Sequence, residues 1–200
     1  VKVIFSLEWE EEFPNGFYIR AFNNQHELQH RWTVFSIGGG SIHIVEKDLD
    51  WNDEVYQENS LKEIKQTLQD RNETLLSYIY SYEPNLPEYL SDIVDAEVEC
   101  VHAGITAEAG TLPGKLRMQR VARKLYTESL ESTSSYANDL KLMSYAYAAG
   151  EENSDTHKVV TAPTLGACGV IAALTYHCIH DLKIEKEKMI DALAIGGIFG

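Results

Sequence analysis

The hydrophobic pattern of this chain changes its period near residue 45, and that change restricts the folds that the chain can adopt. Over residues 1–9 apolar residues alternate with mostly polar ones, which is the period of a β-strand. Further strands are expected at 17–22 and 31–37, each preceded by turn residues. Beyond residue 45 the apolar residues recur at helical spacing. The sequence therefore predicts an α+β fold, with a short antiparallel β segment over 1–45 and a mainly α-helical domain over 46–200.

Capping and breaking residues divide the helical part. Ser60 and Glu63 form a capping-box pattern that predicts a helix start. Pro84 ends that helical region, and Pro87 suits the first turn of the next helix. Additional helices are expected over 137–149, 170–179 and 184–199.

The stretch from Lys158 to Val170 combines a strand-like run, a turn and a helix start. A β-branched run ends at Ala162-Pro163, where the residue before proline favours an extended conformation. Thr164 is a candidate N-cap, which places Cys168 near the first turn of a helix. Unpaired backbone N–H groups there favour an anion such as a thiolate. On the residues alone, however, a buried cysteine that only packs among small neighbours remains an alternative.

This stretch resembles the T-A-P-T-N-G-A-C-G segment of iron-sulfur L-serine dehydratases, also called L-serine ammonia-lyases. Further segments match that family in the same order: Pro14-Asn15-Gly16, Ser36-Ile37-Gly38-Gly39-Gly40, Leu112-Pro113-Gly114 with the basic residues after it, and Glu151-Glu152-Asn153. The resemblance implies that residues 1–45 are the last strands of a small α/β domain. It implies that residues 46–200 are the N-terminal part of the helical catalytic domain.

The resemblance also implies an activity, the deamination of L-serine to pyruvate and ammonia. In that family an iron of a 4Fe-4S cluster acts as a Lewis acid on the hydroxyl group. Cys168 is then a metal ligand, and Thr161 and Thr164 are catalytic candidates. The substrate-binding candidates are in the β segment, where backbone donors could hold a carboxylate: Asn15, Ser36, Gly38, Gly39 and Gly40.

Two departures from the family pattern keep other functions open. Leu165 replaces the usual asparagine, and Phe13 replaces a common histidine. The family's two other cluster cysteines lie beyond its equivalent of Gly200, and one thiolate does not hold a cluster. A missing C-terminal segment or a second subunit is therefore expected to complete the site, in a homo-oligomer. A cluster-dependent L-cysteine desulfidase and a non-catalytic homologue are the alternatives.

Composition and the chain ends restrict the partners and the cellular compartment that we expect for this protein. A formal net charge of −14 argues against nucleic acid as a partner. No run of apolar residues is long enough for a membrane span, so no membrane partner is expected. Three cysteines without a disulfide framework indicate a reducing compartment, the cytoplasm. The chain begins without methionine and stops within apolar sequence, which suggests a fragment of a longer chain.

Several other polar groups are interpreted as structural rather than functional. The Cys100/His102 pair and the His177/His180 pair are each too small for a metal site and are expected to be packing or surface residues. The polar stretch 151–155 is expected to be a solvated loop. The basic residues between 115 and 124 are expected to form a solvated helix face, with attraction of an anionic substrate or partner as the alternative.

Overall fold

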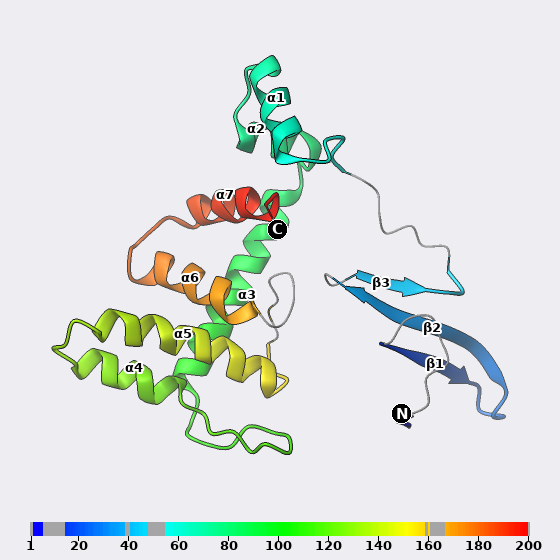
Figure 1. Cartoon of the computed structure of the whole chain (residues 1–200). Helices are drawn as coiled ribbons and strands as arrows, with labels where there is room; N and C mark the ends of the chain where they lie inside the picture. Colours follow the sequence, from blue (N-terminus) through cyan, green and yellow to red (C-terminus); the bar gives the residue numbers. More distant parts are fainter. Residues whose placement is uncertain are drawn as a thin grey trace. The chain divides into compact units, whose positions relative to one another are not determined.

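The computed structural model describes residues 2–5, 15–38, 41–47, 55–158, 160 and 167–199. The chain divides into two compact units (Figure 1), which we call the β unit (Val1–Glu54) and the helical unit (Val55–Gly200). The predicted α+β class is confirmed, with a short antiparallel sheet followed by helices.

The described residues of the β unit form three antiparallel strands in the order β1-β2-β3. These are β1 (Gly16–Phe22), β2 (Leu28–Gly38) and β3 (Ser41–Ile44). The β1–β2 turn is closed by Asn23, whose Oδ1 accepts hydrogen bonds from the backbone N–H groups of Gln25 and Glu27. Two of the three predicted strands and the turn between them are therefore confirmed.

The predicted strand at the start of the chain is wrong over the part that is described. Lys2–Phe5 is not in a strand, and Phe5 is 93% exposed. The third strand is β3 instead, a segment for which the sequence pattern predicted no strand. Gly38 pairs with Ser41, so the chain turns back into the sheet. Alternation predicts which side chains share a face, but it does not predict which segments pair.

The helical unit begins with two short helices, α1 (Leu61–Arg71) and α2 (Leu75–Tyr82). The Ser60 cap is confirmed, because its hydroxyl accepts the N–H of Glu63. Apolar residues at helical spacing continue from residue 61 to residue 79, but this stretch forms two helices and not one. Asn72 adopts a left-handed conformation with φ 53°, and Thr74 caps a new helix.

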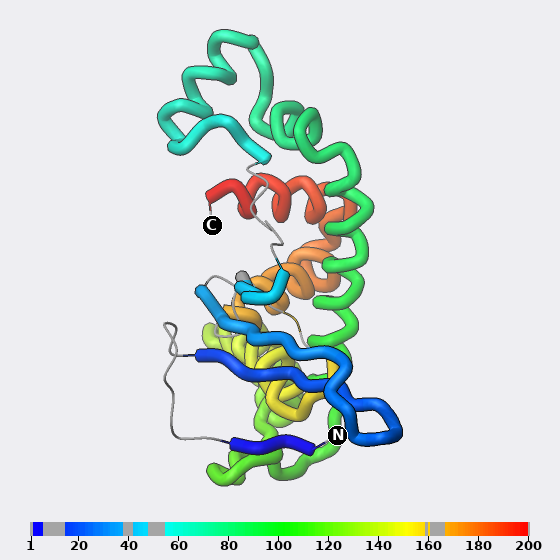
Figure 2. The backbone as a smooth tube through the Cα atoms, turned by 90° about the vertical axis from the view of Figure 1, so that its right-hand side faces the viewer, coloured from blue at the N-terminus to red at the C-terminus, as the bar shows by residue number. Residues whose placement is uncertain are grey.

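The remaining helices pack against the long helix α3 (Leu86–Thr106). They are α4 (Ala122–Glu131), α5 (Ala137–Ser154), α6 (Cys168–His180) and α7 (Lys186–Gly197). Helix α3 contacts α4, α5, α6 and α7, and Figure 2 shows it running along the length of this unit. In the part of the chain that is described, no helix combines the length and the apolar character needed to cross a membrane.

Small residues let three of these helices approach closely. A Cβ atom on Gly104 of α3 would lie 2.6 Å from the backbone of Ala148 in α5. A Cβ atom on Gly169 of α6 would lie 2.7 Å from the carbonyl oxygen of Ala146, also in α5. Because both glycines pack against α5, the ends of α3, α5 and α6 form one core. Its buried members are Cys100, Val101, Ile105, Ala122, Tyr145, Ala148, Ala149, Val160, Cys168, Ala172, Ala173 and Tyr176.

Candidate functional site

Cys168 is the first residue of α6, which confirms its predicted place near the start of a helix, but the residue at the N-cap position is Ala167 and not Thr164. Its side chain is buried in the core described above and is 6% exposed. The sulfur accepts a hydrogen bond from Nδ2 of Asn153, which is in the last turn of α5. Cys168 is therefore held at a helix N-terminus by a neutral donor from a second helix.

The residues around Asn153 are not the solvated loop that the sequence suggested. Glu151, Glu152 and Asn153 all lie in α5 and are all buried, between 4% and 7% exposed. The Glu151 carboxylate accepts the backbone N–H groups of Val121 and Ala122 at 2.6 and 3.0 Å. It thus caps the start of α4, which has no cap of its own.

Arg120 is the cation that makes this burial of carboxylates possible. Its guanidinium donates to Glu152 Oε1 at 2.8 Å and to Asp155 Oδ2, and its Nη1 lies 3.7 Å from Glu151 Oε2. The hydrogen bond and charge of Arg120 lower the pKa of Asp155. Arg120 therefore does not belong to a solvated basic face, and α4 begins only after it.

Cys100 lies in the same core but is a different kind of thiol. Its pKa is raised to about 12, mainly by burial and to a smaller extent by the nearby Glu152 and Cys168. Its Sγ donates to the carbonyl oxygen of Lys158 at 3.2 Å. A thiol held as a donor and kept neutral is not in the state that binds metal.

The histidines also have local partners. His177 Nδ1 lies 2.8 Å from Asp181 Oδ2, and the ring of His180 stacks on Tyr176. Among the described residues, no group of three or more His, Cys, Asp or Glu could hold a metal ion. Cys168 therefore has no partner ligands that complete a metal site among the described residues, which do not by themselves make a cluster site.

A third buried carboxyl group, that of Glu97, lies on α3 and has no charged partner among the described residues. It is 2% exposed, and its Oε2 has no hydrogen-bond partner among the described residues. Burial raises the pKa of this carboxyl, and the neighbouring Thr175 hydroxyl only partly offsets that rise. Glu97 is therefore a destabilising element at neutral pH.

Replacing Glu97 with glutamine is expected to stabilise the protein by about 1–2 kcal/mol at pH 7, because an uncompensated buried charge is removed. The native state holds its proton more tightly than the unfolded chain, so wild-type stability falls as pH rises from the usual glutamate range through the raised pKa. The gain should therefore be largest above that range and vanish near pH 4. Urea unfolding at several pH values measures it, with exposed Glu131→Gln as the control. An equal gain at every pH would contradict this account.

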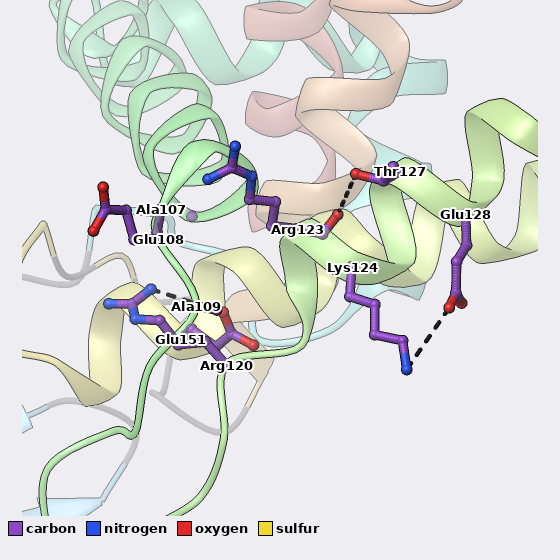
Figure 3. A pocket seen from close by; sticks show the side chains of 10 residues that line it. Ala107, Glu108, Ala109, Arg120, Arg123, Lys124, Thr127, Glu128 and Glu151 are labelled. Atoms are coloured by element: carbon purple, nitrogen blue, oxygen red, sulfur yellow. Dashed lines mark hydrogen bonds and ion pairs between the residues drawn. The ribbon is translucent and has the colours of Figure 1, made fainter.

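A pocket of about 330 Å³ lies between α3, α4 and α5, as shown in Figure 3. Arg120, Arg123 and Lys124 line it together with Glu108, Glu128 and Glu151. These charges balance, and Lys124 lies 3.8 Å from Glu128. Neither Cys168 nor Asn153 is among the lining residues that are described. The pocket is therefore separate from the surroundings of the cysteine.

The remaining candidate residues are only partly described. Asn15 and Ser36 are brought together in the β unit, where the Ser36 N–H donates to the Asn15 carbonyl oxygen at 2.9 Å. Gly38 ends β2 beside them. Thr161, Thr164, Gly39 and Gly40 lie outside the described residues, as do Phe13 and Leu165.

Comparison with known proteins connects this arrangement to a family. The profile described as serine dehydratase alpha chain matches residues 41–200. The chain belongs to that family. The L-serine dehydratase of Helicobacter pylori strain J99 is 31% identical over 92% of this chain and 45% of its own length. L-serine dehydratase 1 of Escherichia coli K12 is 31% identical over 92% of this chain and 44% of its own length.

A third relative, the L-serine dehydratase of Haemophilus influenzae, is 30% identical over 99% of this chain and 47% of its own length. The chain thus spans slightly less than half the length of these curated relatives. Within the family match, the sequence predicted the place of Cys168 near a helix start, but the interpretation of Glu152 and Asn153 as solvated was wrong and did not connect them to Arg120. The adjacent carboxylates of Glu151 and Glu152 could have indicated this contact, because burying two neighbouring carboxylates requires a nearby cation.

Proposed function

We propose that this chain is part of an enzyme that deaminates L-serine to pyruvate and ammonia. Membership of the serine dehydratase alpha chain family over 41–200 carries the proposal. The buried Cys168 at the start of α6 supports it, because this is where the family motif expects a ligand. The reaction removes the α-proton and the β-hydroxyl group of serine as water. The resulting aminoacrylate then takes up water and gives pyruvate and ammonia.

We propose roles for the candidate residues within that reaction. Cys168 is one thiolate ligand of a 4Fe-4S cluster, which would supply a Lewis acid for the departing hydroxyl group. Cys168 is the one described thiol that matches the family's ligand motif, so the other ligands are proposed to come from a further segment of the protein or from a second subunit of a homo-oligomer. Thr161 and Thr164 act near the cysteine. Backbone donors near Asn15, Ser36, Gly38, Gly39 and Gly40 hold the substrate carboxylate, as exposed N–H groups do for anions.

The surroundings of Cys168 agree with a ligand more than with a packing residue. A buried cysteine that only fills space needs no donor, whereas this sulfur accepts an amide N–H. The three cysteines are all free, as expected for the cytoplasm, where we place the enzyme.

Anaerobic expression of the whole gene product and assay with L-serine and L-cysteine tests the proposal. We expect pyruvate from L-serine, with an iron-sulfur absorption band in the visible region. Sulfide release from L-cysteine without turnover of L-serine would favour the desulfidase alternative. A folded, colourless protein that turns over neither substrate would refute the proposal in favour of a non-catalytic homologue.

A further inference from the structure

We propose that Asn153 is a positioning residue. Its side-chain amide group binds both Val160 and Cys168 and thereby fixes the position of the Cys168 sulfur. Val160 precedes the 161–166 segment and Cys168 follows it. Asn153 contacts both of them from the end of a third element, α5. The inference concerns the chain without a cofactor and does not depend on the proposed function.

The contacts of Asn153 determine the orientation of its amide group. Oδ1 accepts the Val160 N–H at 2.9 Å, and Nδ2 donates to the Val160 carbonyl oxygen at 3.0 Å and to Cys168 Sγ. Turning the amide by 180° would place its oxygen against two acceptors and its NH₂ group against a donor. All three bonds would then be lost. The amide therefore has one orientation, and both of its N–H groups are used.

The backbone that carries Asn153 is itself held in place. The His157 N–H donates to the Glu152 carbonyl oxygen, and the Thr156 N–H donates to that of Asn153, which closes the end of α5. Arg120 binds the side chains of Glu152 and Asp155 on either side of Asn153. Support of this kind reduces the freedom of a positioning side chain and sharpens the position of what it holds.

The geometry also has a chemical consequence for Cys168. Because Nδ2 can only donate, the sulfur must present a lone pair to Asn153. A residue that merely filled space at position 153 would leave the sulfur free to rotate about χ1. Asn153 therefore sets both the location and the hydrogen-bonding role of the sulfur.

Labelling of the three cysteines with iodoacetamide at a fixed pH, followed by peptide mass spectrometry, tests this role. In Asn153→Ala we expect Cys168 to react roughly tenfold faster, since the bonds that oppose local opening are lost. Cys100 and Cys178 should react at wild-type rates and serve as internal standards. Ser154→Ala is the matched control, because that exposed hydroxyl donates to the Gly150 carbonyl oxygen in its own helix and contacts neither Val160 nor Cys168 among the described residues.

Hydrogen exchange of the Val160 backbone amide gives a second measurement, which depends on the hydrogen bond that this N–H donates to Asn153 Oδ1. The amide should lose protection in Asn153→Ala, but should keep it in Asn153→Asp, which retains an acceptor and lacks the donors. An unchanged Cys168 rate in the alanine variant would overturn the proposal. Equal acceleration of all three cysteines would also overturn it, because that outcome indicates general loosening.

Discussion

Replacing Cys168 with serine in the whole gene product is expected to reduce pyruvate formation from L-serine by roughly three orders of magnitude or more, as when one member of a catalytic unit is removed. Serine is nearly the same size and still offers an acceptor to Asn153 Nδ2. The core around the start of α6 should therefore persist. What serine cannot supply is a soft thiolate ligand. The assay is the rate of pyruvate release, measured together with the visible absorption of the anaerobically purified protein.

Two comparisons make this result specific. Cys178→Ser changes another cysteine of the same helix, one that is only half-buried, and should retain activity and absorption. Cys168→Ala should lose activity like the serine variant, but should also be less stable by about 1–3 kcal/mol because the Asn153 donor is left unpaired. Full activity in Cys168→Ser would show that the cysteine is a packing residue.

Local sequence patterns predicted the elements that depend on neighbouring residues. The Ser60 cap, the break at Pro84 and the position of Cys168 at a helix start all follow from interactions within a few residues. The β1–β2 hairpin belongs to the same class, since its turn residues form bonds among themselves.

Features that depend on distant partners were missed. Glu152 is buried because Arg120, 32 residues earlier, reaches it, and no periodic pattern contains that pairing. The alternation over residues 1–9 likewise describes a strand face, but Lys2–Phe5 pairs with no strand that is described. The helix that was expected to run past residue 71 is interrupted because Asn72 and Thr74 form a C-cap and an N-cap in succession. An amphipathic face continues unchanged across such a break.

Replacing Arg120 with methionine should have the largest effect on stability of any single substitution considered, a loss of about 3–5 kcal/mol, as when one partner of a buried ionic network is removed. The Arg120 and Glu152 side chains are 9% and 5% exposed. Methionine fills much of the same volume but leaves Glu151 and Glu152 buried together without the guanidinium, with only the His157 ring 2.9 Å from Glu152 among the described residues. The loss in the free energy of unfolding is measured by urea unfolding at pH 7, with circular dichroism as the probe.

The pH dependence separates this charge effect from a loss of packing. Arg120 lowers the pKa of Asp155, so this contribution is present above the usual aspartate range and is lost as pH falls through the lowered value. The difference between wild type and Arg120→Met should therefore shrink as pH falls below about 4. Arg123→Met, three residues later in α4 at an exposed position with no ion pair among the described residues, should stay within about 0.5 kcal/mol of wild type. If both variants lost the same stability at every pH, the buried network would not be what holds the end of α5. The backbone that carries Asn153 would then be held in place by packing alone, and not by the ion pairs of Arg120.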